Sequence, residues 1–231
     1  SRWINSGWLT PLDEFIANPN LTSAEWDVHD FLAGGLGPET GRDGKLYGIP
    51  WVLEGMLSGA SRFDLVTQAG LKYPDTTDDL VKVFQAVNKK ERVSAYVTDS
   101  HYGWTFIPYL QAFGGNVFRN PPDDLFPTLD TPEAIAAADY FARLIREFGP
   151  NGGLTYTADQ STQALKLGRV NFSDSSQAYL AQLGDPASSR TLKTVNFGQL
   201  VQGPAGRFPG MAVHALGIPA GSKNKEAAWA F

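Results

Sequence analysis

Gly44-Lys45-Leu46-Tyr47-Gly48-Ile49-Pro50-Trp51-Val52-Leu53-Glu54-Gly55-Met56-Leu57-Ser58-Gly59-Ala60-Ser61 is the stretch that decides the fold. Its β-branched and aromatic residues predict two short strands, over 45–52 and 56–61. Pro50 has no N–H to donate to a neighbouring strand, so we expect the first strand to end or bulge there. The stretch therefore predicts two extended segments with a break between them.

Trp51 and Glu54 lie at this expected break. A large aromatic side chain and an acid at the end of a strand can leave the sheet and face a ligand. The alternative is structural: an indole buried in the core and an acid on the surface. These residues alone favour neither interpretation.

The composition excludes several classes of protein. The 231 residues carry a net charge of −5, so a nucleic-acid or anionic-membrane partner is not expected. The chain has no cysteine, which excludes disulfides, thiol catalysis and cysteine-based metal sites. No apolar run approaches the roughly 20 residues that cross a bilayer. The aromatic content of 12%, with six tryptophans, suggests neutral ligands that stack on rings.

Helices and strands are expected to alternate along the chain, which indicates the α/β class. The clearest helix starts are Thr76 and Thr131, since each threonine can cap a helix and Pro132 suits a first turn. The expected helices span 24–33, 62–69, 76–87, 100–114, 131–148, 159–167, 175–183 and 222–231, and the expected strands 94–98, 116–118, 169–174, 195–201 and 211–219.

The common catalytic signatures are missing from the sequence, including the P-loop, the dinucleotide-binding glycines, HExxH and GxSxG. His29, His101 and His214 stand far apart and lack the spacing of metal ligands. Glu54 and Asp174 are the one candidate pair for a glycosidase mechanism, which needs two carboxylates across a cleft. No metal and no cofactor are expected.

Six segments in the same order resemble bacterial extracellular solute-binding proteins of the sugar type. The segment at 44–50 is similar to the family's "GklYgiP", and the one at 217–231 to its "gi-x-x-xSkn-x-eaAw-x-F". The six segments are 8–13, 44–50, 62–76, 114–115, 168–174 and 217–231.

The resemblance implies a two-lobed periplasmic-binding-protein type II fold. Residues 1–59 would belong to lobe 1, 60–202 to lobe 2, 203–211 to a hinge crossing, and 212–231 to lobe 1 again. Family members begin with elements that precede residue 1 and continue beyond residue 231. We therefore expect an incomplete first lobe, with any export signal outside this chain.

The resemblance also implies a ligand site. Trp51 and Glu54 follow the family's first crossing, where a ring and an acid contact sugar. Trp104 and Tyr102 match the aromatic start of the cleft helix, and Asp174 matches a strand–helix junction. His214 stands where many members have Trp or Gly, which leaves its role open. The alternatives are core packing for Trp104 and helix capping for Asp174.

The implied function is binding of a sugar or sugar alcohol by hinge closure and delivery to the membrane permease of an ABC importer. The protein would be a monomer and not an enzyme, and it would be periplasmic or extracellular and membrane-anchored. A glycoside hydrolase using Glu54 and Asp174, and a carbohydrate-sensing module without a transport role, remain the alternatives.

Overall fold

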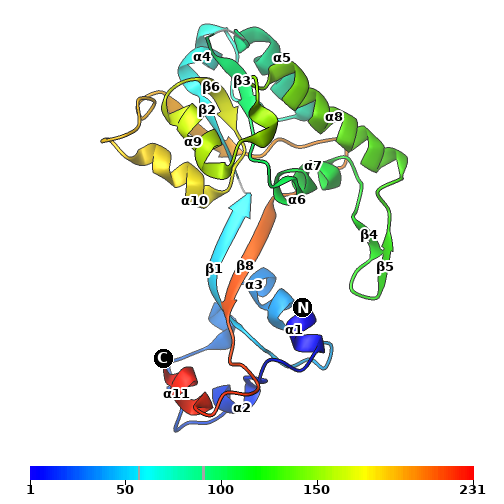
Figure 1. The fold of residues 1–231 in the computed structure, drawn as a ribbon, viewed down its shortest axis with the longest axis vertical. Coiled ribbons are helices and arrows are strands. Elements are labelled where there is room, and N and C mark those ends of the chain that lie inside the picture. Colours follow the sequence, from blue (N-terminus) through cyan, green and yellow to red (C-terminus); the bar gives the residue numbers. More distant parts are fainter. Residues whose placement is uncertain (57, 90–91) are drawn as a thin grey trace. The chain divides into compact units, whose positions relative to one another are not determined.

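The computed structural model describes residues 1–56, 58–89 and 92–231, coloured along the chain in Figure 1. The chain divides into two compact units. Unit 1 comprises Ser1–Glu54 and Ala212–Phe231, and unit 2 comprises Gly55–Met211. Of the crossing expected at 54–61, residue 57 lies outside the described residues.

Both units mix helices with strands, which confirms the α/β class. The α-helices are α1 (Arg2–Asn5), α2 (Asp13–Ile16), α3 (Ala33–Leu36), α4 (Phe63–Gln68), α5 (Thr77–Val87), α6 (Tyr102–Thr105), α7 (Ile107–Ala112), α8 (Pro132–Phe148), α9 (Ala158–Lys166), α10 (Gln177–Leu180) and α11 (Lys225–Ala230). The strands are β1 (Ile49–Met56), β2 (Ser58–Arg62), β3 (Ser94–Val97), β4 (Phe118–Asn120), β5 (Asp124–Pro127), β6 (Val170–Ser173), β7 (Val195–Gln199) and β8 (Gly210–Leu216). Short 3₁₀ helices are Val28–Asp30, Gly37–Glu39, Gly153–Thr155 and Ala181–Gly184.

Unit 2 is built on a four-stranded sheet with the order β3-β6-β2-β7. β3 and β6 are parallel, with Val97 opposite Ser173, whereas β2 runs antiparallel to both β6 and β7. Every residue of β3 and β6 is buried. Parallel strands that are covered by helices on both faces bury all their residues in this way.

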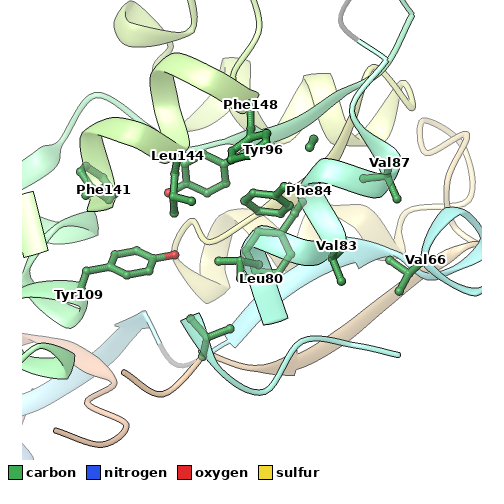
Figure 2. Packing of buried hydrophobic residues seen from close by; sticks show 13 residues of the cluster. Val66, Leu80, Val83, Phe84, Val87, Tyr96, Tyr109, Phe141, Leu144 and Phe148 are labelled. Atoms are coloured by element: carbon green, nitrogen blue, oxygen red, sulfur yellow. The ribbon is translucent and has the colours of Figure 1, made fainter. Parts of the chain in front are cut away.

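Three hydrophobic clusters of the described residues pack in unit 2, and the third is the small group Leu110, Ala134 and Ala137 between α7 and α8. The largest joins α4, α5 and α8 to β3 and β6, and the second joins α9 and α10 to β2, β3 and β6. Phe84 of α5 is the aromatic centre of the largest cluster, with ring centroids 5.4 Å from Tyr96, 5.5 Å from Phe148 and 5.6 Å from Phe172. Figure 2 shows Phe84, Tyr96 and Phe148 in this cluster. The helix expected over 76–87 is confirmed, and its apolar residues Leu80, Val83, Phe84 and Val87 are buried on one face.

In unit 1, residues near the start of the sequence contact residues near its end. The backbone N–H of Thr10 donates to the carbonyl of Ile218 at 2.8 Å, and that of Ala220 donates to Trp8 at 2.8 Å. The indole N–H of Trp229 in α11 donates to Thr22 Oγ1, also at 2.8 Å. The Trp229 ring lies 5.6 Å from that of Trp26 and 5.9 Å from that of Phe15. Aromatic packing therefore holds α11 in this unit.

The expectation that the strand ends or bulges at Pro50 is wrong. Pro50 is the second residue of β1, which continues to Met56 and pairs with β8 in a two-stranded sheet. Each strand of a two-stranded sheet has a partner strand on one side only. A residue whose backbone nitrogen points to the other side makes no hydrogen bond in the sheet, so a proline is tolerated there. Trp51 and Glu54 are consequently strand residues rather than residues at a break.

Two expected helices also differ. The helix expected over 24–33 is replaced by the 3₁₀ turn Val28–Asp30, and α3 begins only at Ala33, the last residue of that range. The helix expected over 100–114 is divided into α6 and α7. Pro108 lies in the first turn of α7, where its missing N–H costs no hydrogen bond. In the described part of the chain, no helix has the length and apolarity to cross a membrane.

Candidate functional site

The carboxyl ends of β3 and β6 bring several polar residues to one edge of the unit 2 sheet. Because Val97 lies opposite Ser173 in parallel strands, Asp99 and Asp174 follow at the same edge. The hydroxyl of Ser175 donates to Asp99 Oδ2 at 3.2 Å. In open α/β sheets this edge is where ligands bind.

Asp174 is fully buried at this edge. Its Oδ2 accepts hydrogen bonds from the hydroxyls of Tyr96 and Tyr109, each at 2.7 Å. Figure 2 shows both tyrosines in the core of unit 2. Burial raises the pKa of the Asp174 carboxyl to about 6, although the two tyrosine hydroxyls act in the opposite direction. The carboxyl is thus an internal acceptor rather than a surface charge.

Ser173 and Thr98 place hydroxyls at the same edge. Within residues 1–56, 58–89 and 92–231, the buried atom Ser173 Oγ has no protein hydrogen-bond partner, and Asp174 Oδ1 accepts neither of the two tyrosine hydroxyls. The Thr98 hydroxyl lies close enough to the carboxyl to lower the pKa of Asp174. A buried polar atom without a partner is costly, so such atoms commonly bond to water or to a ligand hydroxyl. The edge therefore has hydrogen-bonding capacity that the surrounding protein leaves unused.

Tyr102 and Trp104 project from α6, which begins directly after this edge. The Tyr102 hydroxyl donates to the carbonyl of Leu154 at 2.6 Å, so its hydrogen is already engaged. Trp104 is 46% exposed, which differs from the core packing that was its alternative. Its indole is large enough to cover the apolar face of a sugar.

Sequence reasoning missed two residues of the same edge. Asp99 is buried, accepts the backbone N–H of His101 at 2.8 Å, and lies 3.3 Å from His101 Nδ1. A polar residue directly after a buried strand was the available signal, because the expected strand ended at Thr98. For His101 the sequence indicates only that it lacks the spacing of a metal ligand.

In unit 1, the candidate residues lie on the paired strands β1 and β8. Glu54 Oε2 and His214 Nε2 are 3.3 Å apart and form a cross-strand pair. Trp51 is 71% exposed, so the alternative of a buried indole is wrong for this residue. Of the six predicted site residues, Glu54 and His214 have side chains that contact each other.

Two cavities among the described residues are not lined by any of the six candidates. One, of about 650 Å³, lies in unit 1 among apolar residues including Trp26 and Trp229. The other, of about 640 Å³, lies in unit 2 and includes Arg92 and Arg169. Among the residues described, no group of three or more His, Asp or Glu side chains could hold a metal ion.

The chain is similar to known solute-binding proteins both in sequence and in structure. The erythritol/L-threitol-binding protein of Mycolicibacterium smegmatis (strain ATCC 700084 / mc(2)155) is 21% identical over 241 residues, covering 97% of this chain and 50% of the relative. An ABC transporter solute-binding protein from Agrobacterium vitis S4 with bound D-mannitol is 24% identical, with a TM-score of 0.80 over 99% of this chain and 55% of that chain.

A solute-binding protein from Agrobacterium radiobacter K84 in complex with ribitol is 20% identical, with a TM-score of 0.82 over 98% of this chain and 57% of that chain. The chain thus spans about half the length of the relatives it matches. At these identities the structural likeness establishes the fold. The family described as "Bacterial extracellular solute-binding protein" matches residues 1–231, the whole chain. The chain belongs to the bacterial extracellular solute-binding proteins.

Proposed function

We propose that this protein binds a small neutral sugar or sugar alcohol outside the cytoplasm and delivers it to the membrane permease of an ABC importer. The observation that carries the proposal is the family match over the whole chain. The relatives named above for erythritol, D-mannitol and ribitol support linear polyols as the ligand class. The proposed protein is a monomer, exported and anchored at the membrane.

The proposed mechanism is closure of two lobes on the ligand. Lobe 1 includes residues 1–59 and 212–231, lobe 2 includes 60–202, and 203–211 is a crossing between them. Closure excludes water, which strengthens each hydrogen bond to the ligand. Both crossings lie in segments where the chain passes between the two compact units, which is consistent with bending there.

The ligand chemistry follows from the side chains on the two units. A polyol presents C–H groups that an indole can cover, and hydroxyls that carboxylates can accept. Asp174 is buried, so its proposed part is to accept through Oδ1 a hydrogen bond from the deepest ligand hydroxyl or from a bridging water. The proposed ligand-binding residues are Trp51, Glu54, Tyr102, Trp104, Asp174 and His214.

Binding without catalysis is part of the proposal. A glycoside hydrolase would use Glu54 and Asp174, but Asp174 is fully buried and its Oδ2 already accepts two tyrosine hydroxyls. Such a carboxylate is poorly suited to attack or protonate a glycosidic bond. A sensing module shares the fold, and it differs from a transport protein in lacking an ABC permease as its partner.

A ligand screen on the full-length protein tests the proposal. Thermal unfolding is followed with D-mannitol, ribitol, erythritol, D-tagatose and maltose at millimolar concentration. We expect at least one to raise the Tm, because a ligand that binds only the folded state stabilises it. Chromatography of the bound ligand after incubation should return it unchanged. The proposal is wrong if no sugar or polyol raises the Tm, or if the protein hydrolyses glycosides.

A further inference from the structure

A short loop of unit 2, residues 73–75 between α4 and α5, contacts both segments through which the chain enters and leaves that unit. The entering segment continues into β2, where Gly59 lies opposite Gly198 of β7. The leaving segment runs from the end of β7 through 200–207 to β8. Two side chains of the loop, Tyr73 and Asp75, make these contacts.

Tyr73 holds the ends of β2 and β7. Its hydroxyl lies 3.2 Å from the carbonyl oxygen of Gly59 and 3.3 Å from that of Gln199, so one donor is shared between two neighbouring strands. Burial raises the pKa of this hydroxyl, so it stays protonated and remains a donor at neutral pH. A Cβ on Gly198 would come within 2.3 Å of the Tyr73 ring. The ring therefore lies directly on the backbone of β7.

Asp75 holds the leaving segment. Its Oδ2 accepts from Gln202 Nε2 at 2.9 Å, and its Oδ1 accepts from Arg207 Nη2. Its backbone carbonyl accepts the N–H of Gln202, also at 2.9 Å. Arg207 donates its other guanidinium nitrogen to the carbonyl of Leu200 and is only 22% exposed. The Asp75 carboxylate thus bonds both the first and the last residue of 202–207. Its bond to Arg207 joins two charged groups, and such bonds are stronger than those between neutral groups.

Further backbone contacts fix the same loop. The N–H of Ala205 donates to the carbonyl of Ala112 at the end of α7, and the N–H of Thr77 donates to Gln202, each at 2.9 Å. Arg207 is followed by only four residues before the chain passes from unit 2 to unit 1 after Met211. Rotation of the chain in the second crossing is therefore confined to a few residues beyond Arg207.

We propose that Tyr73 and Asp75 are positioning residues for hinge closure. They fix the unit 2 ends of both crossing segments, so that bending takes place before Gly59 and after Arg207. Hinges absorb their dihedral changes in a few residues, and a fixed end restricts which residues do so. This inference rests on the proposed function, because it assigns these residues an effect on ligand release. We call the contacts of Tyr73 and Asp75 with the two crossing segments the clamp. Weakening the clamp allows the closed form to open more readily, which speeds ligand dissociation.

Hydrogen exchange on the ligand-free, full-length protein tests the clamp without reference to any ligand. We compare the parent with Asp75→Ala and with the control Glu147→Ala, which removes an exposed carboxylate paired with Arg143 at 3.0 Å on α8. Amides of 199–211 should exchange about tenfold faster in Asp75→Ala, and those of β3 and β6 should be unchanged. Equal exchange of 199–211 in the parent and Asp75→Ala would overturn the clamp.

Dissociation kinetics then test the positioning role. D-mannitol, ribitol or erythritol, or another ligand of the screen, whichever the parent binds, is released in a stopped-flow dilution. We expect dissociation to be roughly threefold to tenfold faster for Asp75→Ala and for Arg207→Ala, and the gain in the double variant to be less than the product of the two, because both variants remove the shared Asp75–Arg207 contact. The Tm of the ligand-free protein should change little, since Asp75 is exposed.

Hydrogen exchange tests whether the clamp exists, and dissociation kinetics test whether it affects ligand release. Faster exchange with unchanged dissociation overturns the positioning role. If the parent binds no sugar or polyol of the screen, the proposed function fails, and exchange alone decides whether the clamp exists. Glu147→Ala should leave the exchange of 199–211 unchanged, and it should leave dissociation unchanged when the parent binds a ligand.

Discussion

Asp174 receives hydrogen bonds from Tyr96 and Tyr109, which precede it by 78 and 65 residues. At the residue scale, the sequence could indicate a polar residue after a strand, because Asp174 directly follows the buried run 170–173. It could not indicate the burial of that residue or its two partners. Those depend on which residues β3 and α7 bring to the same point, and no local pattern encodes such pairs.

The raised pKa of Asp174 makes a prediction for stability. The carboxyl has an ordinary pKa of 3.8 and a folded-state pKa of about 6, so the folded state binds the proton more tightly. The group therefore adds stability as the pH falls from above 6 to below 4, and that stability is lost as the pH rises. The change corresponds to roughly 2–3 kcal/mol.

Asp174→Asn isolates this contribution, because an amide does not titrate and its oxygen still accepts the tyrosine hydroxyls. Urea titrations at pH 4 to 7 give the free energy of unfolding of the parent and of the variant. As the pH falls, the parent should become more stable relative to the variant. A difference that stays constant over this range would mean that Asp174 does not titrate there.

Trp104 offers a second prediction at this scale. Replacing it with Ala removes an aromatic surface that covers the ligand, which should weaken binding about tenfold. The ligand-free Tm should change little, because the side chain is half exposed. Fluorescence titration with the best ligand of the screen measures the affinity. The control is Trp3→Ala, which removes an exposed indole from outside the candidate site, and equal affinities of Trp104→Ala and the parent would refute the role.

At the scale of elements, local signals predicted helix starts well and strand ends poorly. Thr76 and Thr131 cap α5 and α8 as expected, since capping depends on neighbouring residues only. The course of β1 past Pro50 depends on the two-stranded pairing with β8, which the sequence does not reveal locally. The hairpin of β4 and β5 was half missed for the same reason: only the region of β4 was expected.

The cap of α8 gives a measurable prediction. The hydroxyl of Thr131 accepts the backbone N–H of Ala134 at 3.3 Å, so Thr131→Ala leaves that donor without its partner. Stability should fall by about 1 kcal/mol in urea unfolding. Thr67→Ala, on the exposed side of α4, is the matched control and should leave stability nearly unchanged. Equal midpoints for the two variants would show that the cap contributes nothing.

At the scale of the whole molecule, the order of segments carried more information than any one motif. Composition argued against nucleic-acid and anionic-membrane partners and excluded cysteine-based metal sites, but it indicated no fold. The resemblance of six ordered segments named the family that now matches the whole chain. The proposed ligand-binding residues stay a prediction, and Trp51 and Glu54 belong to one unit whereas Trp104 and Asp174 belong to the other, so no local pattern relates them.

Calorimetric titration of the full-length parent and of Glu54→Ala with the best polyol of the screen tests the central claim most directly. We predict that the parent binds and that Glu54→Ala binds about ten- to a hundredfold more weakly, because a ligand hydroxyl loses a charged acceptor worth roughly 1.5–3 kcal/mol. Glu25→Ala, an exposed acid of the same unit, should bind as the parent does. Equal affinity of Glu54→Ala and the parent would contradict the account, since β1 would then serve only as a hinge.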